Sequence, residues 1–192
     1  MRSCLVMLLL LSTEFASPQE QKDEHAFPTK DHIELLLTQS ERAFDAYEQT
    51  VEQEAAAGGN LATSALKDKE LLVSSREILG RLKKSSELFN SPGGFILVGD
   101  LDDASRNMSL CMGQAGMQSG THAMSGDFTE GQRYLRLSQA CMDTSTLLYT
   151  VSETAFNMYV EYLFAEHDMM NKATEGLQQC ADILKKNQPQ QH

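Results

Sequence analysis

The sequence predicts an all-α fold, an antiparallel bundle of four long helices with a short fifth helix near the C-terminus. Composition is the first indication, because the 192 residues include only 4 Pro and no Trp, and helix-favouring residues are plentiful. The second is a seam whose residues alternate in steps of three and four, the period of a packed helix. The seam comprises Tyr134, Leu137, Cys141, Thr144, Leu148, Val151, Ala155, Met158, Tyr162, Ala165 and Met169. Every other long periodic segment carries a matching stripe, so we expect coiled-coil-like packing.

The chain length fits one domain. We place this helical domain at residues 31–187. A disordered leader is expected at residues 17–30, which are polar and without period, and a polar tail at residues 188–192.

Residues 1–16 have the order of a secretory signal peptide, with Arg2, an apolar run over residues 4–11 and a cleavage site after Ala16. The run is too short to span a bilayer, which takes about 20 apolar residues. We therefore expect an exported protein, periplasmic or extracellular, without an integral membrane segment once the signal is removed. Glu14 matches the cleavage site poorly, and a retained anchor or a frayed apolar N-terminus is the alternative.

A first helix is predicted from residue 31, capped by Thr29 or Asp31 and ended by the turn at residues 58–60. Its inward stripe is Ile33, Leu36, Leu37, Phe44, Tyr47 and Val51. Its outer face is acidic and is predicted to be solvated, with an acidic docking face as the alternative. This face comprises Glu34, Glu41, Asp45, Glu48, Glu52 and Glu54.

A second helix is predicted over residues 61–89, antiparallel to the first. Its expected inward residues are Leu66, Leu72, Val73, Leu79, Leu82 and Phe89. Its expected outward residues are basic: Lys67, Lys69, Arg76, Lys83 and Lys84. The two helices should therefore meet with complementary charges, which orient the hairpin more than they stabilise it.

The Pro and Gly residues at 91–94 predict a break, followed by a buried connector at residues 95–98, with a lone strand as the alternative. Asp100 is expected to cap a third helix that runs to about residue 116, with Asp103 close to a capping-box position. Residues 113–126 are rich in Gly and Ser and are predicted to form the main loop.

The helix that carries the seam is predicted to begin after a cap at Asp127 or Thr129 and to run to about residue 169. A shorter C-terminal helix should follow, with Ala173, Leu177, Cys180 and Leu184 on one face. We expect a kink or turn at residues 167–171, because one helix over residues 129–187 would far outrun the first two.

Charge and motifs exclude several functions. The formal net charge of −11 repels nucleic-acid phosphates, so nucleic acid is not an expected partner. The sequence has neither the Glu-x-x-His pair of carboxylate bundles nor a Gly-rich phosphate cradle with its Lys. Asp100, Asp102 and Asp103 fail as a calcium loop, because Ala104 stands where the third ligand should be. We predict no enzyme activity and no cofactor.

One cluster suggests a metal instead. Soft sulfur donors select Cu(I), and flexible Met side chains could close around the ion. The candidate ligands are Met108, Cys111, Met112, Met117, His122 and Met124. A copper-binding protein is therefore the alternative function, although Met is also the usual filler of irregular helical cores.

Cys111, Cys141 and Cys180 remain after the signal peptide, so at most one disulfide can form within the chain. Cys111 and Cys141 flank the segment that turns the chain back, and we predict that these two are bonded. The remaining thiol is expected to be a buried small apolar group.

The predicted function is a non-enzymatic binding or interaction module, with a protein partner or self-association. Four aromatic residues lie off the main seam: Tyr149, Phe156, Tyr159 and Phe164. Together with the Met-rich segment they could offer an adaptable apolar surface between the third helix and the seam helix. The alternative is that they form a second buried face.

Overall fold

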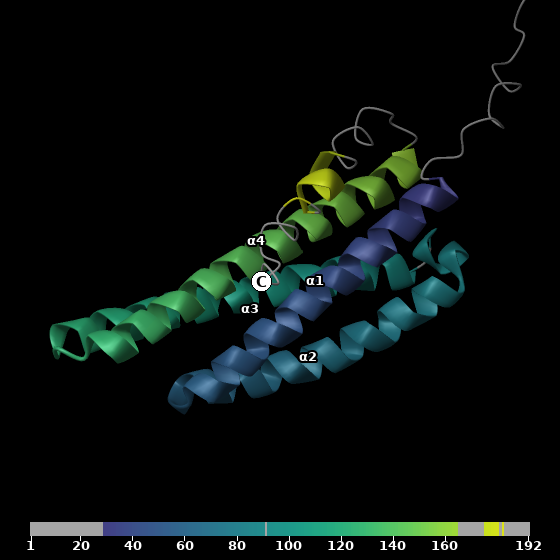
Figure 1. Cartoon of the computed structure of the whole chain (residues 1–192). Coiled ribbons are helices and arrows are strands. Elements are labelled where there is room, and N and C mark those ends of the chain that lie inside the picture. The colour runs from purple at the N-terminus through teal and green to yellow at the C-terminus, as the bar shows by residue number, and fades with distance from the viewer. Residues whose placement is uncertain (1–28, 91, 165–174, 181, 183–192) are drawn as a thin grey trace, which may run out of the picture.

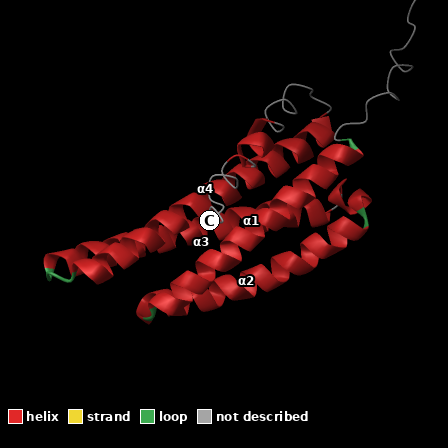
Figure 2. Cartoon of the chain, in the orientation of Figure 1, coloured by secondary structure: helices red, strands yellow, loops and turns green. Residues whose placement is uncertain are grey.

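The computed structural model describes residues 29–90, 92–164, 175–180 and 182. Four long helices follow one another, α1 (Lys30–Ala57), α2 (Gly59–Lys84), α3 (Pro92–Met124) and α4 (Phe128–Phe164), with a short 3₁₀ helix η1 (Ser86–Asn90) between α2 and α3. The described residues contain no strand, and only short turns separate the helices (Figures 1 and 2). The prediction of an all-α bundle is confirmed.

The long helices are arranged around one core. α1 packs against α2 and α4, and α3 packs against the same two helices, whereas α1 and α3 make only a small contact. The most extensive contact joins α3 to α4, which run antiparallel as a hairpin (Figure 1). Each helix therefore has two neighbours, and its remaining surface faces outward.

The start and end of α1 follow the predicted signals. The backbone N–H of His32 donates to the Thr29 hydroxyl at 3.3 Å, which makes Thr29 the N-cap of the helix. Gly58 and Gly59 have φ of +80° and +59°, a backbone conformation that glycine adopts without strain, and they turn the chain into α2.

The opposite charges predicted for the first two helices do meet. Arg76 pairs with Asp45 at 2.7 Å and with Glu48 at 3.1 Å, and Lys83 pairs with Glu41. Because these pairs are partly exposed, each contributes about 1 kcal/mol or less. Their main effect is on the alignment of α1 with α2.

The predicted seam of α4 faces the core. Every seam residue from Leu137 to Met158 is buried, and Tyr134 is half-buried. Thr144 forms a hydrogen bond of 2.8 Å with Thr50 on α1, so the polar interruption of the seam joins two helices. The inward stripe predicted for α1 is likewise buried at all of its positions.

The prediction for α2 was wrong in its bounds, because the helix spans Gly59–Lys84 and Phe89 lies in η1. It was also wrong at Leu66 and Val73, which are 65% and 62% exposed. Apart from Ile78, the buried positions of α2 alternate in steps of four and three: Leu61, Ala65, Asp68, Leu72, Ser75, Leu79 and Leu82. Helix geometry fixes which positions face the core, and in α2 small and polar residues occupy three of them. The exposed Leu66 and Val73 lie one heptad apart on another face.

The prediction for α3 was wrong at both ends. The helix begins at Pro92 and runs to Met124, so residues 95–98 are helical, Asp100 lies inside the helix, and only residues 125–127 connect α3 to α4. Proline suits the first turn of a helix, since that N–H has no partner within the helix.

The segment predicted as the main loop is the last part of α3. Its Gly and Ser residues permit close contact with α4. The Ser119 hydroxyl donates to the Gly131 carbonyl at 2.7 Å. A Cβ added at Gly131 would lie only 3.3 Å from the backbone oxygen of Ser119. The Ser138 hydroxyl similarly donates to the Met112 carbonyl at 2.9 Å. These contacts offset the roughly 1 kcal/mol that each helical Gly costs.

The beginning of α4 is as predicted, with the Glu130 N–H donating to the Asp127 carboxylate at 3.2 Å. Residues 175–180 are helical, and Leu177 and Cys180 are buried, with Cys180 Sγ 4.0 Å from the Leu147 carbonyl of α4. The predicted signal peptide at 1–16, most of the leader, the kink at 167–171 and the tail at 188–192 lie outside the described residues. Lys30, placed in the leader, belongs to α1.

None of the described helices combines the length and the apolar character that crossing a bilayer requires.

The predicted disulfide is confirmed. Cys111 of α3 is bonded to Cys141 of α4, with their Cα atoms 6.0 Å apart. Cys180 is a free, buried thiol, and burial raises its pKa to about 12. It therefore behaves as a small apolar side chain, as expected from the sequence.

Opening this disulfide should destabilise the bundle. The bonded residues are 30 positions apart, and a loop of that size corresponds to about 3–4 kcal/mol of unfolding free energy. Urea denaturation followed by circular dichroism on the Cys111→Ser/Cys141→Ser variant measures the loss. Cys180→Ala is the control that removes a thiol without opening a loop; identical curves for wild type and the double variant would contradict the expectation.

Candidate functional site

The outward surface of α4 carries a stripe of large apolar side chains. These residues, the α4 stripe, are Phe128, Leu135, Met142, Tyr149 and Phe156, each seven positions after the last. They are between 42% and 67% exposed. A seven-residue spacing keeps side chains on one face of a helix, with a drift of about 20° per heptad. α4 therefore has two seams, one in the core and one on the surface.

The relation between the two seams follows from the helical period. Met142, Tyr149 and Phe156 each come directly after a buried seam residue. Consecutive helical residues differ by about 100° in direction, so the α4 stripe points away from the core to the side. The stripe lies beside the face with which α4 contacts α3.

Small residues cover the neighbouring surface of α3. Ser105 and Ser109 contact Ser145 of α4 at 3.2 Å and 2.8 Å through their hydroxyl groups, which fixes the lateral contact of the two helices. Along the adjacent face run Ser109, Gly113, Gly116 and Gly120, here called the small face of α3. A Cβ added at Gly113 or Gly120 would meet no atom within 4 Å. This face is therefore open to close approach by another chain.

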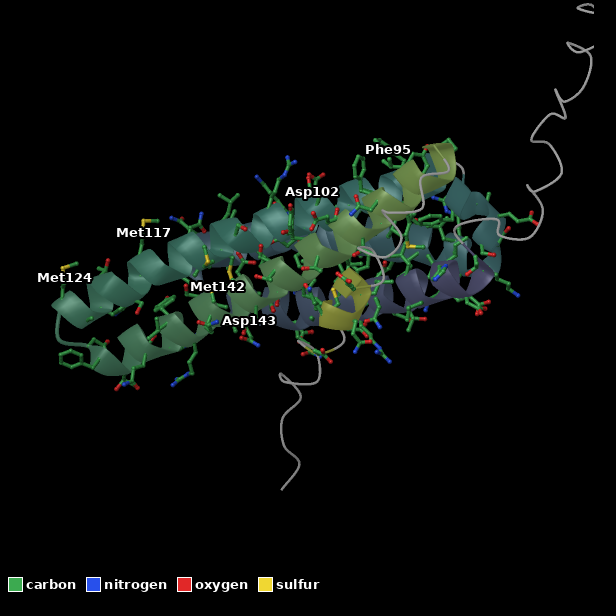
Figure 3. The ribbon with its side chains drawn as sticks, turned by 90° about the horizontal axis from the view of Figure 1, so that it is seen from above. Phe95, Asp102, Met117, Met124, Met142 and Asp143 are labelled. Carbon is green, nitrogen blue, oxygen red and sulfur yellow. A yellow bond between two sulfur atoms is a disulfide. The ribbon has the colours of Figure 1, made fainter. Side chains whose placement is uncertain are left out.

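Beyond the small face, α3 carries three exposed apolar residues that are also seven positions apart. Leu110, Met117 and Met124 are 64%, 68% and 86% exposed. Figure 3 shows Met117 and Met124 projecting from α3, with Met142 on the neighbouring α4. The outward side of the hairpin thus combines large flexible apolar groups with small ones.

The hairpin also extends past the α1–α2 turn. The Arg133 guanidinium and the Tyr134 hydroxyl donate to the Ala56 and Ala57 carbonyls at 2.8 Å and 3.3 Å, which marks where α1 ends beside α4. Beyond Tyr134 the α3–α4 hairpin continues to the turn at 125–127, and this part of it is here called the overhang (Figure 1). At a helical rise of 1.5 Å per residue, it is about 10 Å long. At its base the His122 ring stacks on Tyr134 with centroids 5.3 Å apart.

The predicted aromatic surface is present in part. Tyr149 and Phe156 are 54% and 47% exposed, so the alternative of a second buried face does not hold for them. Tyr159 is half-buried, with its ring 5.9 Å from that of Phe95. The side chain of Phe164 lies outside the described part of the chain. Sequence analysis missed the exact heptad register that joins Tyr149 and Phe156 to the other three residues of the stripe.

The six candidate copper ligands all lie on α3. Cys111 is in the disulfide, and Met108 is fully buried in the core. Met112 is half-buried against the core, whereas Met117 and Met124 are exposed. His122 stacks on Tyr134 and lies 3.7 Å from Asp127. Sixteen helical steps separate the first ligand from the last, about 24 Å, so the structure does not bring the six together.

A second feature of the molecule is a polar cluster inside the bundle. Glu54 of α1 and Asp68 of α2 are 0% and 1% exposed, and Tyr47 of α1 is fully buried. The prediction that Glu54 belongs to the solvated acidic face was therefore wrong. Its position three residues after the buried Val51 and seven after Tyr47 continues the inward stripe, and this spacing was the signal that could have identified it.

The acids of this cluster lack ordinary partners. Of the seven buried side-chain oxygens without a hydrogen-bond partner in the described structure, four belong to it: both Glu54 oxygens, Asp68 Oδ2 and the Tyr47 hydroxyl. Burial, reinforced by the neighbouring Asp68, raises the pKa of Glu54 to about 8. Burial also raises the pKa of Tyr47. Glu54 therefore holds its proton at neutral pH when no cation is present.

Comparison with known proteins finds no matching family, no similar curated protein and no similar solved structure. The function is therefore inferred from the α4 stripe, the small face of α3 and the buried polar cluster.

The Glu54 pKa predicts how stability depends on pH. Because the folded state keeps a proton that the unfolded state loses near pH 4.5, the free energy of unfolding should fall between about pH 5 and 8, by up to about 1.4 kcal/mol per pH unit from this group. Glu54→Gln should flatten this decline. Urea denaturation at several pH values, in buffer with EDTA, measures this decline in the free energy of unfolding.

Glu52→Gln is the matched control, since Glu52 is an exposed acid on the same helix. Its stability should follow the wild-type pH profile. Parallel profiles for wild type and Glu54→Gln would show that Glu54 is not the group responsible.

Proposed function

We propose that this chain is a non-enzymatic interaction module that binds a second copy of itself through the α4 stripe. The observation that carries the proposal is the exposure of five large apolar side chains at strict heptad spacing on one helix. A heptad stripe is the pattern by which helices recognise other helices.

The size of the apolar surface supports association. Large side chains such as these have surfaces of roughly 150–250 Å², and about half of each is exposed, which gives roughly 500 Å². That is near the upper end of what a monomeric protein exposes, and patches of this size are often functional. The stripe spans about 42 Å of helix, enough for an interface of the standard size of about 800 Å² per partner.

The complementarity of the two outward faces supports a second copy as the occupant. The chain carries large apolar groups on α4 and, beside them, the small face of α3, where Gly113 and Gly120 leave open space. A two-fold axis can place the α4 stripe of each protomer over the small face of the other. Two hairpins would then form a four-helix interface of interlocking large and small residues.

The copper alternative has less support, because its six candidate ligands are spread along α3 and one of them is in a disulfide. No described group of residues supports a catalytic alternative.

Self-association is tested by substituting the stripe. Leu135→Glu/Tyr149→Glu should convert a dimer into a monomer, because each change places a charge at the centre of the apolar contact. Light scattering coupled to gel filtration, over protein concentrations up to about 100 μM, measures the mass. A wild-type protein that stays monomeric throughout this range would exclude self-association and leave a different partner to be sought.

The matched control is Leu66→Glu/Val73→Glu, which changes two comparably exposed apolar residues on α2. This variant should remain dimeric. If it dissociates as readily as the stripe variant, the effect arises from added charge and not from the stripe.

A further inference from the structure

The buried polar cluster gathers oxygen atoms from three helices. Asp68 of α2 lies close enough to raise the pKa of both Glu54 and Tyr47, and Asn107 of α3 and Ser64 of α2 are the polar neighbours of Tyr47 and Glu54, respectively. None of these neighbours forms a hydrogen bond of ordinary geometry with the Tyr47 hydroxyl or with the Glu54 carboxyl group. These side chains are separated by up to 60 positions in the sequence, so the fold itself brings them together.

This cluster contains two carboxyl groups and no positively charged side chain to pair with them. Two carboxyl groups that are at least 99% buried normally require a salt bridge, because an unpaired buried ion costs several kcal/mol. No Lys, Arg or His is among the groups that act on Glu54 or Tyr47. The charge of the two acids must therefore be balanced by protons or by a metal cation.

We propose that the Glu54 and Asp68 carboxylates bind a hard divalent cation of the Ca²⁺ class in the interior of the bundle. The Tyr47 hydroxyl is an independent indication, since it is fully buried beside the two acids and has no hydrogen-bond partner in the described structure. A bound cation would accept a lone pair from the Tyr47 hydroxyl oxygen as well as lone pairs from the two carboxylates.

The chemistry of the donors selects the type of cation. All of them are oxygens, which suit hard cations and not the soft Cu(I) considered for α3. Mg²⁺ usually keeps several of its waters, whereas Ca²⁺ takes six to eight oxygen ligands, most of which the protein can supply, so a buried cluster favours Ca²⁺.

The charge of the proposed site also matches that of a divalent cation. The described residues bring no three His, Cys, Asp or Glu side chains together, so the site relies on two carboxylates supplemented by neutral oxygens of Tyr47, Asn107 and Ser64. Two carboxylates neutralise one divalent ion.

Terbium luminescence provides a direct test. Tb³⁺ substitutes for Ca²⁺ at oxygen sites and emits when a nearby aromatic ring is excited; the chain has no Trp, and Tyr47 lies at the site. Titration of the full chain with Tb³⁺ should give sensitised emission that Ca²⁺ reverses. Glu54→Gln/Asp68→Asn should abolish it, and Tyr47→Phe should remove most of the emission.

The control is Glu52→Gln/Glu70→Gln, which removes two exposed acids from the same two helices. It should bind Tb³⁺ as the wild type does. Ca²⁺ should also raise the melting temperature of the wild type and of this control, but not of Glu54→Gln/Asp68→Asn. If the double variant does not fold, Glu54→Gln alone serves in both measurements.

Two results would overturn the proposal. Equal emission and equal stabilisation by Ca²⁺ in the site variants and the wild type would mean adventitious binding to the acidic surface. Absence of any Ca²⁺ effect on the wild type at millimolar concentration would mean that the buried cluster binds no cation. Neither result concerns the α4 stripe, so the cation site and the proposed self-association are tested independently.

Discussion

The bundle depends on one geometrical constraint, the alternation of three and four residues that keeps one side of each helix in the core. A position on this seam is buried whatever residue occupies it. Thr144 is accommodated by a hydrogen bond to Thr50 across the helices. Oxygens of Asp68 and Glu54 have no such partner. Burying these carboxyl groups therefore costs free energy that an apolar seam would not cost. The buried polar cluster thus arises where acidic residues occupy seam positions.

The same constraint explains what the sequence could predict. The seams of α1 and α4, the caps at Thr29 and Asp127, each one of two predicted candidates, and the glycine turn that ends α1 follow local rules and were predicted correctly. The disulfide was also predicted correctly. Leu66 was predicted to be buried because it is a large apolar residue. The unbroken seam spacing of α2 runs instead through Ala65 and Asp68. Strict register is a better guide to burial than side-chain size when a seam contains small or polar residues.

The length of α3 could not be predicted from local rules, because its stability depends on another helix. Isolated Gly and Ser residues favour a loop, and propensity alone ends the helix near residue 116. Tertiary contact reverses this preference, since the small residues let α3 approach α4 closely, with Ser119 donating to the carbonyl of Gly131. The α4 stripe was incompletely predicted for a related reason. Periodicity shows that a helix has two apolar faces, but only the arrangement of its neighbours shows which face is left uncovered.

The two candidate sites are joined by the last turn of α1. Glu54 lies two and three residues before Ala56 and Ala57, whose carbonyls accept hydrogen bonds from Arg133 and Tyr134 at the base of the overhang. Whatever occupies the buried cluster therefore acts on the segment that holds this end of α4 in place. A cation restrains Glu54 more strongly than a proton does, because it binds donors from three helices at once. Such restraint would make the overhang, where the α4 stripe begins at Phe128, a more rigid surface for association.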